Sequence, residues 1–380
     1  MDFYASSVRH RRCSSVQRYS KVAKGMHRNK FRTIMAASAA ALAVLTATAC
    51  STDEPVPTSA ELRKVTVQYG WLLDGGSAAS CTAVVKGYYR DAGLDVTLKA
   101  GGPVAATFLN ATNAVATNPA VDIAVDNDLV TLIEGKARKD DKYSVRAFAS
   151  LWQKSPLGFI VRADSGINSL KDLAKTKSDG SKYVIGSTPG APIFKALADY
   201  AGVTVKDLKI TTISGDATPF IAGKVDALLG FSTNQAVAVE KAGIPYRFLP
   251  VSELPGFTQP VYVAMAREEF IAKNPELLDK WLKATAQGAR ETIRDPKAAA
   301  QYLRDERCGG KELNAEQQQT LVEKSIDYMK VDGSDAQIGQ LNLDVIKGFV
   351  PAYSTAAGLP RTPAVEELID TSVVQRVYGK

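Results

Sequence analysis

The sequence predicts an α/β protein of two lobes, because strand-like and helix-like segments alternate in two successive sets along the chain. The first set begins at residues 64–71, whose alternating β-branched side chains are typical of a strand, and the second begins at residues 158–165. Such alternation predicts mainly parallel sheets with helices on both faces. Extended segments at 156–162 and 259–265 join the two sets, so we expect a hinge of two strands and a ligand cleft between the lobes.

The remaining elements follow the same rhythm. In the first set we expect further strands at residues 94–100, 121–127 and 144–153, and helices at 81–93, 103–112 and 128–137. In the second set we expect strands at 182–187, 208–214, 225–231, 246–251 and 260–270, with helices at 169–176, 192–202 and 233–243. From Asn274 onward the chain is almost entirely helical in pattern. One lobe is expected to span 63–157 plus 260–380, and the other 158–259.

The N-terminal region has the pattern of an export signal. Basic residues precede a small and apolar run from Thr33 to Ala49, which is too short for an ordinary membrane span. The signal is expected to cover residues 1–49, with Met26 as an alternative start. Residues 50–62 then form a flexible tether rich in Pro, Ser, Thr and acidic residues.

Charge and histidine content change once the signal is removed. The whole chain has a formal net charge of +7, but residues 1–49 hold nine Lys or Arg and one acidic residue, so the mature part carries about −1. This balance argues against a nucleic-acid partner. Both histidines, His10 and His27, lie in the leader, so the mature chain lacks the commonest general base and metal ligand. We therefore expect no metal site and no cofactor.

Four cysteines are present, and two of them remain in the mature domain. Cys13 leaves with the signal and Cys50 follows its cleavage site. Cys81 and Cys308 are able to form a disulfide outside the cytoplasm. Their separation in sequence says nothing about their distance in space, so their pairing stays open.

Two groups of residues resemble known families. Ala47, Thr48 and Ala49 before Cys50 resemble the lipobox of bacterial lipoproteins, although Ala47 stands where Leu is usual. Four segments, KGYYRDAGLDVTL, SPLGFIVRADSGINSLKDLAKTK, FIAGKVDALLGFSTNQAVAVEKAGI and VYVAMAREEFIAKNPELLDKWLKA, resemble the substrate-binding proteins of ABC importers. The nearest group takes up nitrate, sulfonates, taurine and pyrimidine or flavin vitamin precursors. The resemblance covers roughly residues 64–350.

This resemblance implies a fold, partners and a location. The implied fold is the type II periplasmic-binding-protein-like fold, with the ligand held in the cleft. The implied partners are a small-molecule ligand and the permease and ATPase subunits of an importer, and the protein is expected to act as a monomer. A lipidated Cys50 would anchor it to the outer face of the cell membrane. A receptor that signals through a membrane partner is an alternative that the residues do not separate.

Cleft contacts of the first lobe are expected in loops at the carboxyl ends of its strands. Trp71, Asp74, Gly76 and Ser77 follow the first strand, where glycine allows close backbone approach. The family has a W-x-P-N loop here, from which Leu73 and Asp74 depart. Later candidates in this lobe are Asp126, Asn127, Trp152, Gln153 and Tyr262. Each of Trp152 and Tyr262 either faces the ligand or belongs to the core, and Asp128 is expected to cap a helix.

The second lobe contributes two loops. Ser187, Thr188 and Gly190 lie where a strand passes into a helix, a place that offers hydroxyls and free amides. A plain helix cap is the alternative for this loop. The segment of Phe231, Thr233 and Asn234 is similar to a T-N-E/Q-P motif of the family, with Ala236 in place of proline.

The chemistry of these loops suggests a class of ligand. They carry hydroxyls, amides, aromatic rings and acidic groups but no Arg or Lys, so a buried nitrate, taurine or alkanesulfonate is disfavoured. A neutral or weakly basic planar heterocycle suits them better, such as a thiamine pyrimidine precursor or a flavin-like vitamin. One branch of the superfamily is an enzyme that makes the thiamine pyrimidine from its own histidine and carries a cysteine cluster. The mature chain has neither feature, so we expect a binding protein and not an enzyme.

Overall fold

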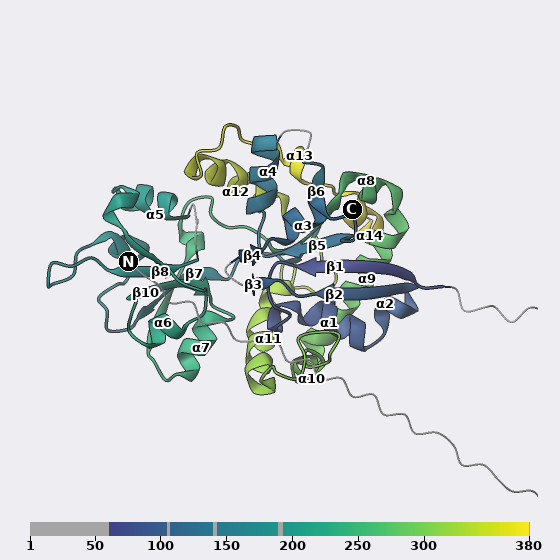
Figure 1. The fold of residues 1–380 in the computed structure, drawn as a ribbon, viewed down its shortest axis with the longest axis horizontal. Helices are drawn as coiled ribbons and strands as arrows, with labels where there is room; N and C mark the ends of the chain where they lie inside the picture. The colour runs from purple at the N-terminus through teal and green to yellow at the C-terminus, as the bar shows by residue number, and fades with distance from the viewer. Residues whose placement is uncertain (1–60, 105–106, 140–142, 189–192, 380) are drawn as a thin grey trace, which may run out of the picture. The chain divides into compact units, whose positions relative to one another are not determined.

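Two five-stranded sheets organise the computed structural model, which describes residues 61–104, 107–139, 143–188 and 193–379. The first sheet takes four of its strands from residues 63–152 and the fifth from residues 261–267, which follow the strands of the second sheet in the sequence (Figure 1). Its order is β2 (Leu94–Lys99), β1 (Arg63–Tyr69), β5 (Ile123–Asp126), β12 (Val261–Arg267) and β6 (Val145–Trp152). The second sheet, drawn in teal, has the order β11 (Tyr246–Pro250), β7 (Leu157–Arg162), β10 (Ala227–Phe231), β8 (Val184–Ser187) and β9 (Lys209–Thr212).

Strand direction agrees with the expected parallel sheets, except for one strand in each. β1 pairs in parallel with β2 and β5, whereas β12 pairs antiparallel with β5 and β6. In the second sheet β8 is parallel to β9 and β10, and β7 is antiparallel to β10 and β11. The reversed strands, β7 and β12, lie on the two predicted crossing segments at 156–162 and 259–265, because a chain that enters a sheet from the other one arrives from the opposite end. The carboxyl ends of the parallel strands in each sheet therefore share one edge.

The helices and 3₁₀ turns cover these sheets. In the first set they are η1 (Gly75–Ser77), α1 (Ala78–Val85), α2 (Tyr88–Asp91), α3 (Ala111–Thr117) and α4 (Val130–Lys139). In the second they are η3 (Leu170–Ala174), α5 (Ile193–Ala201), η4 (Val205–Asp207), α6 (Thr218–Ile221), α7 (Gln235–Lys241) and η5 (Val251–Glu253). The C-terminal part contains α8 (Glu268–Lys273), α9 (Pro275–Arg294), α10 (Pro296–Tyr302), α11 (Ala315–Met329), α12 (Leu343–Ala356), α13 (Val365–Leu368) and α14 (Ser372–Tyr378).

The expected helix at 103–112 is wrong. In its place β3 (Gly102–Val104) pairs antiparallel with β4 (Thr107–Leu109), and α3 begins only at Ala111. Asn110 follows β4, and its side-chain oxygen accepts a hydrogen bond from the Asn113 amide and caps α3. The expected helix at 81–93 is also divided, since Gly87 adopts a φ of 81° between α1 and α2.

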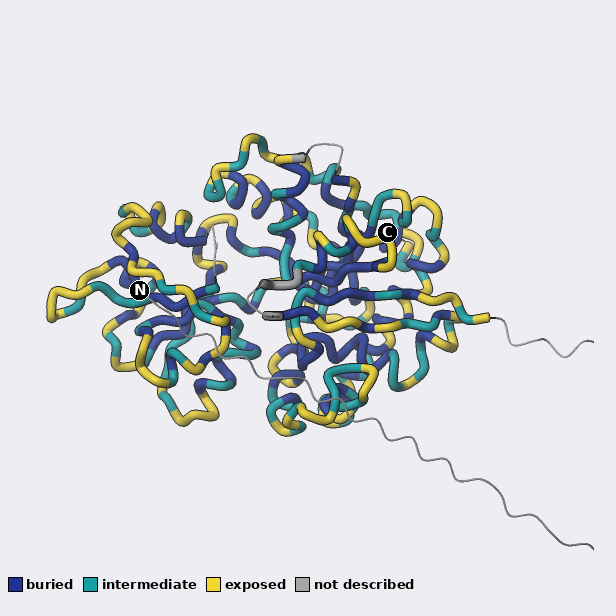
Figure 2. Tube along the Cα trace, in the orientation of Figure 1, coloured by how far each residue is buried: buried dark blue, intermediate teal, exposed yellow. Residues whose placement is uncertain are grey.

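The core lies on the faces of both sheets, and most strands are buried along their lengths (Figure 2). α9 covers the first sheet with an apolar face of residues spaced three and four apart, including Leu278, Trp281 and Leu282. The Trp281 ring packs edge-on against Phe148 of β6, with centroids 5.7 Å apart. None of the helices in the described ranges is long and apolar enough to cross a membrane.

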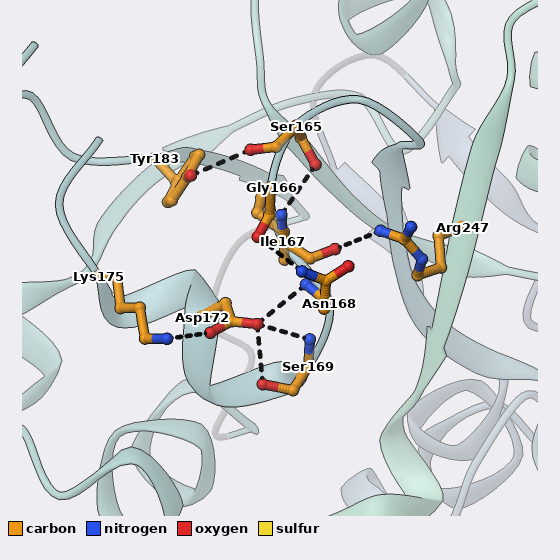
Figure 3. Close-up of polar contacts among 9 residues, drawn as sticks. All are labelled: Ser165, Gly166, Ile167, Asn168, Ser169, Asp172, Lys175, Tyr183 and Arg247. Atoms are coloured by element: carbon orange, nitrogen blue, oxygen red, sulfur yellow. Dashed lines mark hydrogen bonds and ion pairs between the residues drawn. The ribbon is translucent and has the colours of Figure 1, made fainter. Parts of the chain in front are cut away.

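The turn after β7 begins where the sequence indicates, at Ser169. Asp172 accepts hydrogen bonds from the backbone amides of Asn168 and Ser169, at 2.9 and 2.8 Å, and from the Ser169 hydroxyl (Figure 3). Lys175 lies 2.5 Å from the same carboxylate. The lysine and these donors lower the pKa of Asp172 to about 2. The sequence SLKDLAK thus builds a capping box that fixes the loop leaving β7.

A disulfide joins the two cysteines whose pairing the sequence leaves open. Cys81 of α1 and Cys308, which follows α10, are bonded, and their Cα atoms are 5.8 Å apart. Cys81 is fully buried. The bond closes a loop of 227 residues and ties the first helix of the described region to its C-terminal part.

Replacing either of two helical glycines by alanine is expected to change stability in opposite directions. A methyl group at Gly288 of α9 would lie 2.2 Å from the Ala79 carbonyl oxygen of α1, whereas one at Gly348 of α12 would meet no atom within 4 Å. We expect Gly288→Ala to lower the free energy of unfolding by about 2 kcal/mol through overpacking. Gly348→Ala is expected to raise it by about 0.5–1 kcal/mol, because alanine is the better helix former. Urea unfolding of both variants measures the contrast, and equal effects would contradict the close contact of α1 with α9.

Candidate functional site

A pocket with a cavity volume of about 80 Å³ lies where loops from the two sheets meet, and we call it the inner pocket. Its lining includes nine of the fifteen predicted ligand contacts, namely Trp71, Asp74, Gly76, Asn127, Trp152, Phe231, Thr233, Asn234 and Tyr262. Six of these belong to the first sheet: three lie in the loop after β1, and the others lie after β5, at the end of β6 and on the reversed strand β12. The other three belong to the second sheet, where Phe231 ends β10 and Thr233 and Asn234 follow it. The carboxyl ends of strands therefore build the pocket, as open α/β sheets do.

Asp74 is the acidic group of the inner pocket. Its Oδ1 accepts from the Gly76 amide at 3.0 Å and its Oδ2 from Asn234 Nδ2 at 3.0 Å. Trp71 also hydrogen-bonds this side chain. Burial raises the pKa of Asp74 to about 6, although these donors each oppose the rise. The carboxyl is 6% exposed, so it offers a desolvated acceptor at the junction of the two sheets.

Three aromatic rings form the back of the inner pocket. Trp152 packs edge-on against Tyr262 with centroids 4.7 Å apart and stacks on Tyr328 of α11 at 5.5 Å. Tyr262 has a φ of 51°, a left-handed backbone that is unusual for tyrosine and is held by the surrounding structure. Trp152 and Tyr262 are only 2% and 3% exposed, so they belong to the core as well as to the pocket lining.

The second sheet closes the pocket with the loop after β10. Asn234 reaches across to Asp74, as given above, and Ser232 in the same loop makes a 3.1 Å hydrogen bond with the Tyr328 hydroxyl. Gln235 fixes the loop, because its side chain accepts from the Phe231 amide at 2.8 Å and donates to the Gly215 carbonyl at 2.7 Å. Polar contacts thus join the two sheets directly at the pocket.

Other predicted contacts are placed elsewhere. The Asp126 carboxylate accepts from the Thr112 amide and hydroxyl and does not line the pocket. The Ser77 hydroxyl donates to the Asp74 carbonyl oxygen. The Ser187 hydroxyl donates to the Thr188 carbonyl oxygen. All three residues are buried; the two hydroxyls bond to nearby backbone in their own loops, whereas Asp126 joins the end of β5 to the start of α3.

Gln153, another predicted contact, lies away from the inner pocket. Its side chain donates to the carbonyls of Ser150 and Gln340, at 3.2 and 3.0 Å, and borders a different surface pocket. Trp152 and Gln153 are adjacent at a strand end, so their side chains point to opposite sides, and only one of them faces the cleft. Gly190 lies outside the described residues.

Two lining residues come from a helix that the sequence does not connect with the site. Leu321 and Ser325 of α11 border the inner pocket. Gln318 of the same helix accepts a hydrogen bond from the Gly75 amide at 2.8 Å, and this contact holds α11 against the loop after β1. The three residues lie on one helical face, at intervals of three and four. That periodicity is the only signal in the sequence that marks them as facing inward.

A second and larger cavity, the outer chamber, adjoins the inner pocket. Its volume is about 320 Å³, and it shares Trp71, Asn127 and Phe231 with the inner pocket. Thr188, a predicted contact, lines this chamber, as does Asp128. Asp128 accepts from the Val130 amide at 2.9 Å and so caps the start of α4, as expected.

The donor set of the inner pocket suits some ligands better than others. Among the described residues that line it, acidic, amide and hydroxyl groups occur without any Lys or Arg. An anion here would lack a charged donor and would lie near Asp74. A flat molecule that donates hydrogen bonds is the better match, because it would satisfy the carboxylate and contact the aromatic rings. In the described residues no group of three or more His, Cys, Asp or Glu side chains is arranged to hold a metal ion.

Known proteins resemble the chain in sequence and in fold. It is 24% identical over 314 residues to a riboflavin-binding protein of Chloroflexus aurantiacus, and the alignment covers 76% of this chain and 82% of that protein. It is 25% identical over 339 residues to a 4-amino-5-hydroxymethyl-2-methylpyrimidine phosphate synthase of Saccharomyces cerevisiae, covering 83% of this chain and 93% of the synthase.

Among solved structures, a periplasmic sulfonate-binding protein of Methylobacillus flagellatus superposes with a TM-score of 0.56. The match has 21% identity and covers 84% of this chain and 94% of that one, which shows a shared fold. The expected periplasmic-binding-protein-like fold is thereby confirmed. The sequence also matches the family described as NMT1/THI5 like over residues 76–299, from the loop after β1 to α10. The chain therefore belongs to the NMT1/THI5-like family.

Proposed function

We propose that this protein is the extracytoplasmic solute-binding component of an ABC importer and captures a small planar heterocycle in the inner pocket. The observation that carries the proposal is the meeting of loops from both sheets around one buried acceptor, Asp74. A ligand placed there would contact both sheets at once. Its binding energy would then favour the arrangement in which they are close together, and a transporter would recognise that arrangement.

A nitrogen heterocycle is the favoured ligand class. Ring N–H or amino groups would donate to Asp74, and the ring would lie against Trp71 or the edges of Trp152 and Tyr262. A thiamine pyrimidine precursor and a flavin-like vitamin both have these features. Two of the relatives are a riboflavin-binding protein and a pyrimidine phosphate synthase, and their names refer to the same two classes of ring.

The location follows from the sequence before the described region. A signal at residues 1–49 and a lipidated Cys50 would export the chain and anchor it to the outer face of the membrane. The Cys81–Cys308 disulfide supports this location, because disulfides persist outside the reducing cytoplasm. Radiolabelled palmitate incorporation into the wild type, and its loss in Cys50→Ala, tests the anchor.

An enzymatic function is the second candidate, since several relatives are named synthases. The synthase-like branch resembled by the sequence uses a histidine, and the only histidines of this chain are His10 and His27. The inner pocket therefore offers no imidazole, and binding without turnover is the function that its residues support. Incubating the purified protein with a bound heterocycle and following product by mass spectrometry distinguishes the two.

The heterocycle proposal is tested by a thermal-shift screen of residues 51–380. The screen compares 4-amino-5-hydroxymethyl-2-methylpyrimidine, riboflavin, taurine, an alkanesulfonate and nitrate. A heterocycle is expected to raise the melting temperature by mass action, whereas the anions leave it unchanged. A shift with the anions alone would contradict the proposed ligand class and favour the sulfonate or nitrate alternative.

Asn234→Ala is expected to weaken binding of the heterocycle found in that screen by about tenfold, because it removes a polar group that positions Asp74. Isothermal titration calorimetry measures the change. Gln319→Ala is the control, since Gln319 lies on α11, lines neither cavity and is half-buried, and its side chain bonds only to Glu323 among the described residues. Unchanged affinity in Asn234→Ala would show that the ligand does not use the junction of the two sheets.

A further inference from the structure

The outer chamber has the size and lining of a ligand site, although only four of the fifteen predicted contacts line it. Its volume of about 320 Å³ is four times that of the inner pocket, at about 80 Å³. Small-molecule sites are usually roughly 300–1,000 Å³ and mainly apolar, with a few polar groups. By that measure the inner pocket holds only part of a ligand, whereas the outer chamber has room for a ring system.

One wall of the outer chamber is aromatic. Phe257 and Phe349 meet edge-on with centroids 6.0 Å apart, and Phe349 lies 5.6 Å from Tyr353. Leu157 of β7 provides apolar surface from the second sheet. The Tyr353 hydroxyl donates to Glu134 at 2.7 Å, so this wall presents ring surface and a satisfied hydroxyl.

Two oxygen acceptors in the chamber lack a donor. Asn127 Oδ1 is buried and has no hydrogen-bond partner in the described part of the chain. Asp128 uses Oδ1 to cap α4, and no described residue donates to its second carboxylate oxygen. A buried acceptor without a donor, such as Asn127 Oδ1, costs free energy that a ligand with N–H or O–H donors would recover, and Asp128 offers a second acceptor in the same chamber. Burial, followed by the nearby charge of Asp126, raises the pKa of Asp128 to about 7.

We propose that the outer chamber is a second subsite of the same ligand, and that it takes an additional aromatic ring with a hydrogen-bond donor facing Asn127 and Asp128. This inference rests on the proposed function, because the inner pocket supplies the other half of the site. Asn127 borders both cavities, so the two parts of the ligand lie on either side of it. The preferred ligand is then a fused-ring nitrogen heterocycle and not a single pyrimidine.

Matched one-ring and two-ring probes test the subsite. We expect 4-aminoquinazoline to bind about tenfold more tightly than 4-aminopyrimidine in calorimetry, because its second ring is buried against the aromatic wall. Equal affinities, or a preference for the single ring, would overturn the second subsite and leave the proposed function intact. Failure of both probes to bind would overturn the inference together with the heterocycle class.

Two substitutions of Leu157 test whether the second ring of the probe occupies the outer chamber. Leu157→Trp fills the chamber and is expected to remove the advantage of 4-aminoquinazoline while keeping the affinity for 4-aminopyrimidine. Leu157→Met conserves volume and should keep the advantage. An equal loss for both probes in Leu157→Trp would show that the cavities are not separate subsites.

Asp128→Asn tests whether the second ring of the ligand donates a hydrogen bond to Asp128. Asparagine retains an oxygen to cap the Val130 amide but replaces the free acceptor with an NH₂ group. We expect about a tenfold loss of affinity for 4,7-diaminoquinazoline, which carries an amino group on its second ring, and little change for 4-aminoquinazoline, whose second ring has no N–H donor. Asp344→Asn, on a 97% exposed side chain of α12, is the control, and thermal unfolding checks that each variant folds. Equal losses for both quinazolines would overturn the assigned role of Asp128.

Discussion

Replacing Cys81 and Cys308 together by alanine is expected to lower the free energy of unfolding by about 5 kcal/mol. The disulfide closes a loop of 227 residues, and a crosslink of that length removes much of the conformational entropy of the unfolded chain. Cys81 is also fully buried in the core around α1, so its truncation adds a small packing loss. Guanidinium unfolding of residues 51–380 at neutral pH measures the difference.

A reducing agent provides the control for the disulfide prediction. Dithiothreitol should shift the unfolding midpoint of the wild type toward that of the double variant, while the double variant itself should not respond. If the oxidised wild type and the variant unfold at the same denaturant concentration, the crosslink does not stabilise the fold. The expected result also means that the chain reaches full stability only after oxidation.

Asp74→Asn is expected to stabilise the empty protein by about 3 kcal/mol at pH 7.5, because it removes a buried charge. Burial raises the pKa of Asp74 from 3.8 to about 6, and the difference in pKa between folded and unfolded states is a difference in stability. Asparagine can still accept from the Gly76 amide through its oxygen. Chemical unfolding between pH 3.5 and 8 follows the effect.

The sign of the pH dependence is fixed by the direction of the shift. Below pH 3.8 the carboxyl is protonated in both states and has no ionisation penalty. As pH rises to about 6, the unfolded state releases its proton first, so the wild type loses stability relative to Asp74→Asn. The difference should be complete above pH 6 and constant beyond it. A gap that grows toward acid pH would contradict the buried carboxylate.

Asp172→Asn is expected to change the stability at pH 7.5 in the opposite direction from Asp74→Asn. The pKa of Asp172 is lowered to about 2 by Lys175 and its loop donors, so its charge stabilises the folded state above pH 3.8. Neutralising it should therefore destabilise the protein at pH 7.5, and the difference should shrink as pH falls toward 2. The contrast implies that Asp74 is retained at a cost in stability, as expected of a binding group.

The sequence predicts the strand ends that build the inner pocket but not which neighbour at each end faces it. Asn127, Trp152 and Thr188 line the inner pocket or the outer chamber. The residue beside each one, Asp126, Gln153 or Ser187, lines neither of them. Adjacent residues at a strand end point to opposite sides, and the side that faces the cleft depends on the partner sheet. Strand propensity contains no information about that partner.

Two further features of the structure are not predicted by the sequence. Residues 103–112 have a helix-like composition, yet β3 pairs with β4 in the structure, so strand pairing replaces that local tendency. Leu321 and Ser325 reach the pocket because α11 packs against the loop after β1, more than 240 residues earlier in the chain, as the Gly75–Gln318 hydrogen bond shows. This second contact is not visible in a local window of sequence.

The hydrogen bond between Asn234 and Asp74 gives the unliganded cleft a resting state of its own. A molecule that enters the cleft has to break this contact first, and the contact forms again beside the ligand, because each carboxylate oxygen accepts two hydrogen bonds. Capture would then contain a first-order opening step, so the observed association rate should level off at high solute concentration instead of rising without limit. If the protein supplies an importer as proposed, the rate of uptake would be limited by how often the two sheets separate spontaneously at this contact.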